Sequence, residues 1–106
     1  MSSVSSLIDE RSRYRRLKNN LNTYVDYLDK SIDKLEVAIN NIKSNIMIND
    51  SNEFVKKMKD SLQNLKNDKS KIKNSVLPGI DKKIRSLGDA IERAQKEAEA
   101  AANAIM

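Results

Sequence analysis

The most constraining feature of this sequence is an apolar residue at every seventh position through its first half. A repeat of this length predicts one long amphipathic α-helix that lays one side against another helix. No glycine or proline occurs before Ile48, so the helix is expected over about 6–48, with Ser5 or Ser6 as its N-cap. The repeating series, called the stripe below, consists of Leu7, Tyr14, Leu21, Leu28, Leu35 and Ile42.

A second apolar series follows the stripe, and its spacing changes along the helix. Leu17 and Tyr24 come three residues after a member of the stripe. Val25, Ile32 and Ile39 come four residues after one. A straight helix with 3.6 residues per turn drifts in this way against a strict seven-residue repeat. The drift favours a hairpin or bundle over a long parallel coiled coil.

The composition excludes several classes of chemistry. Without cysteine there can be no disulfide, thiolate metal ligand or cysteine nucleophile. Without histidine, the commonest general base and metal ligand is also missing. The serines and tyrosines have no neighbouring base to activate them, and the carboxylates are scattered at ordinary helix-surface spacing. We therefore expect no enzymatic activity, no metal and no cofactor.

Length and polarity indicate the architecture and the compartment. The 106 residues suffice for one domain, and 33% charged residues with two glycines and one proline favour an elongated helical shape. No apolar run approaches the ~18 residues of a membrane span. Residues 1–9 lack the basic and apolar regions of a Sec signal peptide. The expectation is an all-α cytoplasmic protein that forms a single domain over 1–106.

The clearest interruption of the helical pattern is the polar stretch 49–52, Asn-Asp-Ser-Asn. Short polar side chains bond to nearby backbone groups and favour turns. Asp50 and Glu53 resemble a capping box that opens a second helix over about 53–102. Because a short loop makes two long helices antiparallel neighbours, the sequence predicts an elongated antiparallel helical hairpin.

A second irregularity lies at Pro78-Gly79. Extension of the preceding apolar spacing leads to Gly79 and Lys83. The apolar residues stand one position later, at Ile80 and Ile84, and regular spacing then resumes. Proline removes a backbone hydrogen bond and kinks or breaks a helix. We expect the second helix to be continuous but kinked; a true break that gives three helices is the alternative.

A hairpin folded near residue 50 places Leu7 opposite Ala94, and Ile42 opposite Met58. Besides the stripe, the predicted packing residues are Met58, Leu62, Leu65, Ile72, Ile80, Ile84, Leu87 and Ile91. Beyond about residue 98 the second helix outruns the first, which leaves its alanine-rich end free for a partner. Candidate partner-binding residues lie on this end and beside the stripe: Tyr27, Ile48, Ala94, Ala98, Ala102 and Ile105.

Basic residues cluster near the start of the chain, at Arg11, Arg13, Arg15, Arg16 and Lys18, and lysines recur through the second helix. Such a cluster either contacts phosphate or an acidic partner, or forms a solvated face balanced by nearby carboxylates. The lysines are spread around the helix, and no aromatic residues interleave with them. The pattern therefore does not indicate nucleic-acid binding.

The full-length pattern resembles the WXG-type helical hairpins of type VII secretion. It is more similar still to the small α-helical proteins that accompany LXG-domain effectors in Gram-positive bacteria. The resemblance rests on the serine-rich start Ser2–Leu7, the turn Asn49–Phe54 and the stretch Val76–Asp81. Two family features are missing: the Trp-X-Gly motif at the turn, and the Tyr-x-x-x-Asp/Glu export motif after the second helix.

The resemblance implies a targeting chaperone that has no complete export signal of its own. Such a protein binds the helical N-terminal domain of a larger LXG-type effector, alone or with another small helical protein. It acts as part of a hetero-oligomer rather than as a monomer, and it either stays in the cytoplasm or is secreted together with its partner. From the residues alone, a self-associating structural coiled-coil subunit of a cytoplasmic assembly is the alternative function.

Overall fold

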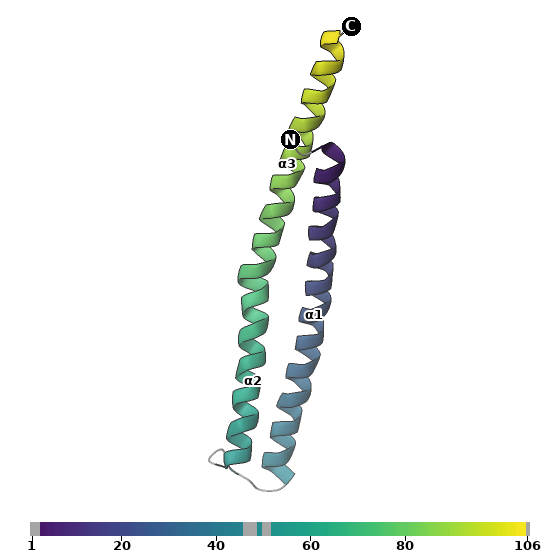
Figure 1. Cartoon of the computed structure of the whole chain (residues 1–106). Coiled ribbons are helices and arrows are strands. Elements are labelled where there is room, and N and C mark those ends of the chain that lie inside the picture. Colours follow the sequence, from purple (N-terminus) through teal and green to yellow (C-terminus); the bar gives the residue numbers. More distant parts are fainter. Residues whose placement is uncertain (1–2, 46–48, 50–51, 106) are drawn as a thin grey trace. The chain divides into compact units, whose positions relative to one another are not determined.

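The computed structural model describes residues 3–45, 49 and 52–105, and nearly all of them are helical (Figure 1). Helix α1 spans Val4–Asn45, and α2 spans Glu53–Lys71. A π-helical turn, η1, follows over Ile72–Val76 and leads directly into α3, Leu77–Ile105. The predicted all-α class is therefore confirmed, and so is an irregular second helix. No described helix is long and apolar enough to cross a membrane.

The chain packs as two compact units, Met1–Asn20 with Leu77–Met106, and Leu21–Val76. In the first unit α1 lies beside α3, and in the second it lies beside α2 and η1 (Figure 1). Pairs across the first unit are Tyr14–Lys83 and Lys18–Asp81; pairs across the second are Asp29–Lys69 and Glu36–Lys66. Within each unit the numbers rise on one helix as they fall on the other, which confirms antiparallel packing.

Helix α1 begins earlier than the sequence indicated. The Ser3 hydroxyl accepts a hydrogen bond from the Ser6 backbone N–H at 3.1 Å, so Ser3 is the N-cap. The prediction of Ser5 or Ser6 is wrong. All these serines can cap, and starting at Ser3 adds backbone hydrogen bonds and half-buries Val4, which favours the longer helix.

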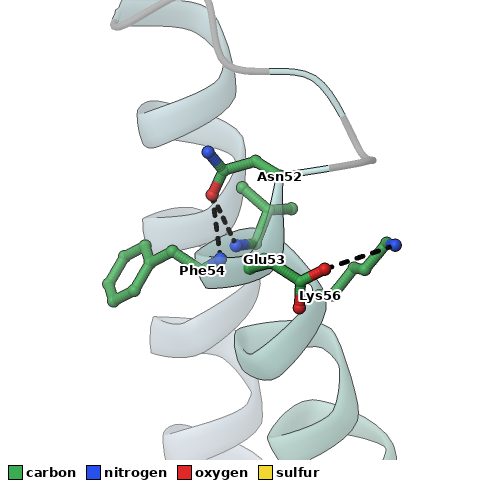
Figure 2. A network of polar contacts seen from close by, with 5 residues as sticks. Asn52, Glu53, Phe54 and Lys56 are labelled. Atoms are coloured by element: carbon green, nitrogen blue, oxygen red, sulfur yellow. Dashed lines mark hydrogen bonds and ion pairs between the residues drawn. The ribbon is translucent and has the colours of Figure 1, made fainter.

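Helix α2 is capped by Asn52 (Figure 2). Its backbone is extended, and its side-chain oxygen accepts hydrogen bonds from the N–H groups of Phe54 (2.9 Å) and Val55 (3.3 Å). This corrects the capping role predicted for Asp50, which lies outside the described residues. The Asn52 cap holds the first turn so that Val55 is completely buried while Phe54 is exposed.

We expect Asn52→Ala to lower the free energy of unfolding by about 1 kcal/mol, because two N-terminal backbone donors lose their acceptor. Urea unfolding followed by circular dichroism measures the change. Asn64→Ala is the matched control: Asn64 is exposed inside α2, where alanine is the better helix former. An equal loss in both variants would contradict the cap.

The η1 turn explains the one-residue slip in the apolar spacing. A π turn holds one residue more than an α turn, so it offsets such a slip. Ile80 is accordingly buried, whereas Gly79 and Lys83 are exposed. The Pro78 ring would conflict with the carbonyl four residues earlier, at Asn74, which lies inside the wider turn. The irregularity therefore precedes Pro78 by one turn, and the helix continues.

Candidate interaction surfaces

None of the predicted packing residues is fully exposed. Leu28 (3% exposed), Ile80, Leu87 and Ile91 are buried. The others are half-buried: Leu7, Tyr14, Leu21, Leu35, Ile42, Met58, Leu62, Leu65, Ile72 and Ile84. Within the stripe only Leu28 is buried, so elsewhere on α1 the stripe lies at one edge of the contact.

The centre of the contact on α1 lies four residues after the stripe. Val25, Ile32 and Ile39 are buried there in the second unit. In the first unit the equivalent positions are Arg11 and Lys18, both half-buried. The Lys18 ammonium forms an ion pair with Asp81 at 2.7 Å, and an Arg11 guanidinium nitrogen lies 4.0 Å from the point that a Cβ on Gly88 would occupy. The same face of α1 is therefore apolar in one unit and cationic in the other.

This arrangement leaves apolar residues exposed on the opposite flank of α1. Leu17 is 44% exposed and Tyr24 48% exposed, although both belong to the apolar series beside the stripe. Tyr27, a predicted partner-binding residue, is 68% exposed. Leu17 and Tyr24 keep the seven-residue spacing, and Tyr27 lies one turn beyond Tyr24. We call these three residues the exposed flank of α1.

In the first unit the flank borders a surface hollow of about 530 Å³. The Lys83 ammonium lies 6.0 Å from the centre of the Tyr14 ring, at the outer limit of a cation–π contact. The hollow has both apolar and charged lining residues. Its lining residues are Ser6, Asp9, Glu10, Arg13, Tyr14 and Leu17.

The end of α3 is the second surface without a covering helix. Ala94 is half-buried, but every described side chain from Gln95 to Ala104 is exposed, including Ala98 and Ala102. Of the remaining predicted partner-binding residues, Ile48 and the side chain of Ile105 lie outside what the structure describes.

The second unit carries a charge-matched groove on the side away from the exposed flank. Lys69 pairs with Asp29, and Lys66 pairs with Glu36 at 3.3 Å. All four line one hollow of about 520 Å³. Exposed pairs of this kind contribute up to about 1 kcal/mol each, but they favour one register of the two helices.

The described residues contain no cluster of three or more carboxylates that could hold a metal ion. Comparison with protein-family models, with curated proteins and with solved structures finds no match for this chain.

Proposed function

We propose that this chain is a non-catalytic binding partner that packs against a helical domain of a larger protein. Its partner is the helical N-terminal domain of an LXG-type effector, for which the chain serves as a targeting chaperone in type VII secretion. The exposed flank of α1 carries the proposal: Leu17 and Tyr24 continue a seven-residue repeat, but their own chain does not cover them.

A third helix is the natural occupant of such a flank. One α-helix can pack on two neighbours when its apolar residues occupy the positions both three and four residues after each stripe member. On α1, Val25, Ile32 and Ile39 serve the intramolecular contact, which leaves Leu17 and Tyr24 for another helix. Covering these two large side chains contributes about 2–4 kcal/mol to binding, and tyrosine is enriched at such centres.

The cellular role follows from the resemblance in sequence. In this proposal the effector contributes to the export signal, and the composite bundle presents the surface that the secretion machinery recognises. In this proposal the chain is made in the cytoplasm, binds its effector there, and leaves only as part of the complex. The exposed end of α3 extends the surface that the bundle offers.

We expect Tyr24→Ser to weaken binding of the LXG-type helical domain encoded beside this gene at least about tenfold, or 1.4 kcal/mol. Calorimetric titration of the purified chain measures the affinity. Because Tyr24 is half exposed, its replacement should leave the helical circular dichroism unchanged.

Val37→Ser is the matched control. Val37 is 57% exposed on the same helix, but it lies about 140° around the axis from Tyr24. Equal weakening by both substitutions would contradict the placement of the site, and no binding by the native chain would contradict the function. A stable dimer of the chain alone, disrupted by Tyr24→Ser, would instead favour the self-associating subunit.

A further inference from the structure

The first unit has a groove on the side of α1 away from the exposed flank, and its charges are unbalanced. Arg15 and Arg85, called the arginine pair below, line the same hollow of about 510 Å³, together with Lys18 and Asp81. The Lys18–Asp81 ion pair uses the carboxylate in that hollow, at 2.7 Å. Among the described residues, neither arginine forms an ion pair. Two like charges thus face one groove without a counter-ion.

The same kind of groove in the second unit is charge-matched. There two of the three lysines that line the groove have a carboxylate across it, in the pairs Asp29–Lys69 and Glu36–Lys66, and three lysines are matched by three carboxylates in all. An acidic residue at position 85 would give the first unit the same arrangement. The arginine pair, by contrast, has no such carboxylate of its own across the groove.

Arg11, one turn before Arg15 on α1, adds an unused donor. Its Nε atom is buried and has no hydrogen-bond partner, although buried polar groups are normally satisfied. An Arg11 guanidinium nitrogen lies 4.0 Å from the point that a Cβ on Gly88 would occupy, and Arg11 does not itself line the hollow of the arginine pair. The cationic character of this unit therefore extends one turn beyond the arginine pair.

We propose that the arginine pair binds a carboxylate from an acidic segment of the protein partner. The guanidinium fork matches carboxylate geometry, and two forks from facing helices can hold one such group. This inference rests on the proposed function in one respect only, that the partner is a protein. It assigns to that partner an acidic side chain on the face opposite to the exposed flank.

The groove favours a single carboxylate over a nucleic acid. A nucleic-acid strand requires a row of cations that follows its phosphates, and usually aromatic side chains for its bases. Here the hollow of the arginine pair also contains the carboxylate of Asp81, which interrupts the positive charge. No aromatic residue lines it. The groove can neutralise one acidic group but cannot track a polyanion.

Nuclear magnetic resonance of the full chain tests the proposal through the side-chain Nε–H signals of Arg15 and Arg85. The probe is a short helical peptide of glutamate and alanine. Inorganic phosphate and a single-stranded DNA oligonucleotide, at matched ionic strength, form the comparison arms. We expect both arginine signals to shift with the peptide, and Arg85→Glu to weaken peptide binding at least about tenfold.

Arg85→Glu also separates binding from folding. Its far-UV circular dichroism should stay native, because Arg85 is an exposed residue of α3, while binding is lost. Lys71→Glu makes the same charge change at an exposed residue of α2 and should leave peptide binding intact. Undiminished binding by Arg85→Glu, or stronger binding of DNA than of the peptide, would overturn the proposal.

Failure here is distinguishable from failure of the proposed function. Tyr24 lies about 180° around α1 from Arg15, so effector binding through the exposed flank does not depend on the arginine pair. If the native chain does not bind the acidic peptide but still binds the effector domain through Tyr24, only the acidic contact is rejected. If the chain binds the acidic peptide but not the effector domain, the helical partner is rejected and the carboxylate site is retained.

Discussion

Leu28→Asp should abolish the folded state. Leu28 is 3% exposed in the middle of the second unit, so aspartate there would bury a charge with no partner. An uncompensated buried charge costs about 3–5 kcal/mol, to which the lost apolar contacts add. Single domains have about 5–15 kcal/mol of stability, and a two-helix core is thin. Far-UV circular dichroism at 25 °C should show loss of most helical signal.

Asn22→Asp is the control for Leu28→Asp. It places the same charge on the same helix, at an exposed position, and should change stability by less than about 0.5 kcal/mol. A folded Leu28→Asp protein with native helicity would show that the stripe does not lie in a core.

One-residue deletions should have opposite effects in η1 and in α2. Deleting Asn64 turns the preceding part of α2 by about 100° and carries Val55, Met58 and Leu62 away from α1. The loss is about 5 kcal/mol, from three apolar side chains. Deleting Ser75 removes the extra residue of η1 and converts it to an α turn, so the apolar spacing becomes regular.

The Ser75 deletion is best made together with Pro78→Ala, since proline in a regular helix interior costs about 3 kcal/mol. Pro78→Ala alone should be neutral to slightly stabilising, because η1 already accommodates the ring. Thermal melts compare the stability of the Asn64 deletion, the Ser75 deletion combined with Pro78→Ala, and Pro78→Ala alone. Equal destabilisation by the two deletions would mean that η1 does not absorb the slip.

The sequence predicted the helices, their antiparallel packing and the irregularity near Pro78. It predicted Tyr27 as an exposed partner-binding residue but missed Leu17 and Tyr24, because an apolar pattern does not show which side of a stripe faces the partner helix. After Tyr14 the facing position is the cationic Lys18, so Leu17 was the only apolar candidate there, whereas after Leu21 both Tyr24 and Val25 are apolar. The sequence did contain a signal for the true packing face. The positions four residues after the stripe form one line along the helix from Arg11 to Ile39, and the second helix has an acidic residue, Asp81, that pairs with Lys18.

Local competition explains the other misses. Several adjacent short polar residues could cap each helix. Ser3 and Asn52 are the actual caps, because the position of each cap depends on how far packing extends the helix. The irregular turn precedes Pro78 because proline conflicts with a carbonyl one turn earlier. The arginine pair could not be found from sequence, because residues 15 and 85 come together only through the register of two helices.

Cysteine labelling tests the central claim most directly, because the chain contains no cysteine of its own. Single cysteines at Leu17, at Tyr24 and, as a control, at exposed Ser12 should all react with a maleimide in the free protein. Bound to the helical effector domain, Leu17→Cys and Tyr24→Cys should become protected while Ser12→Cys stays reactive. Unchanged reactivity at both flank positions in a saturated complex would contradict docking on the exposed flank of α1.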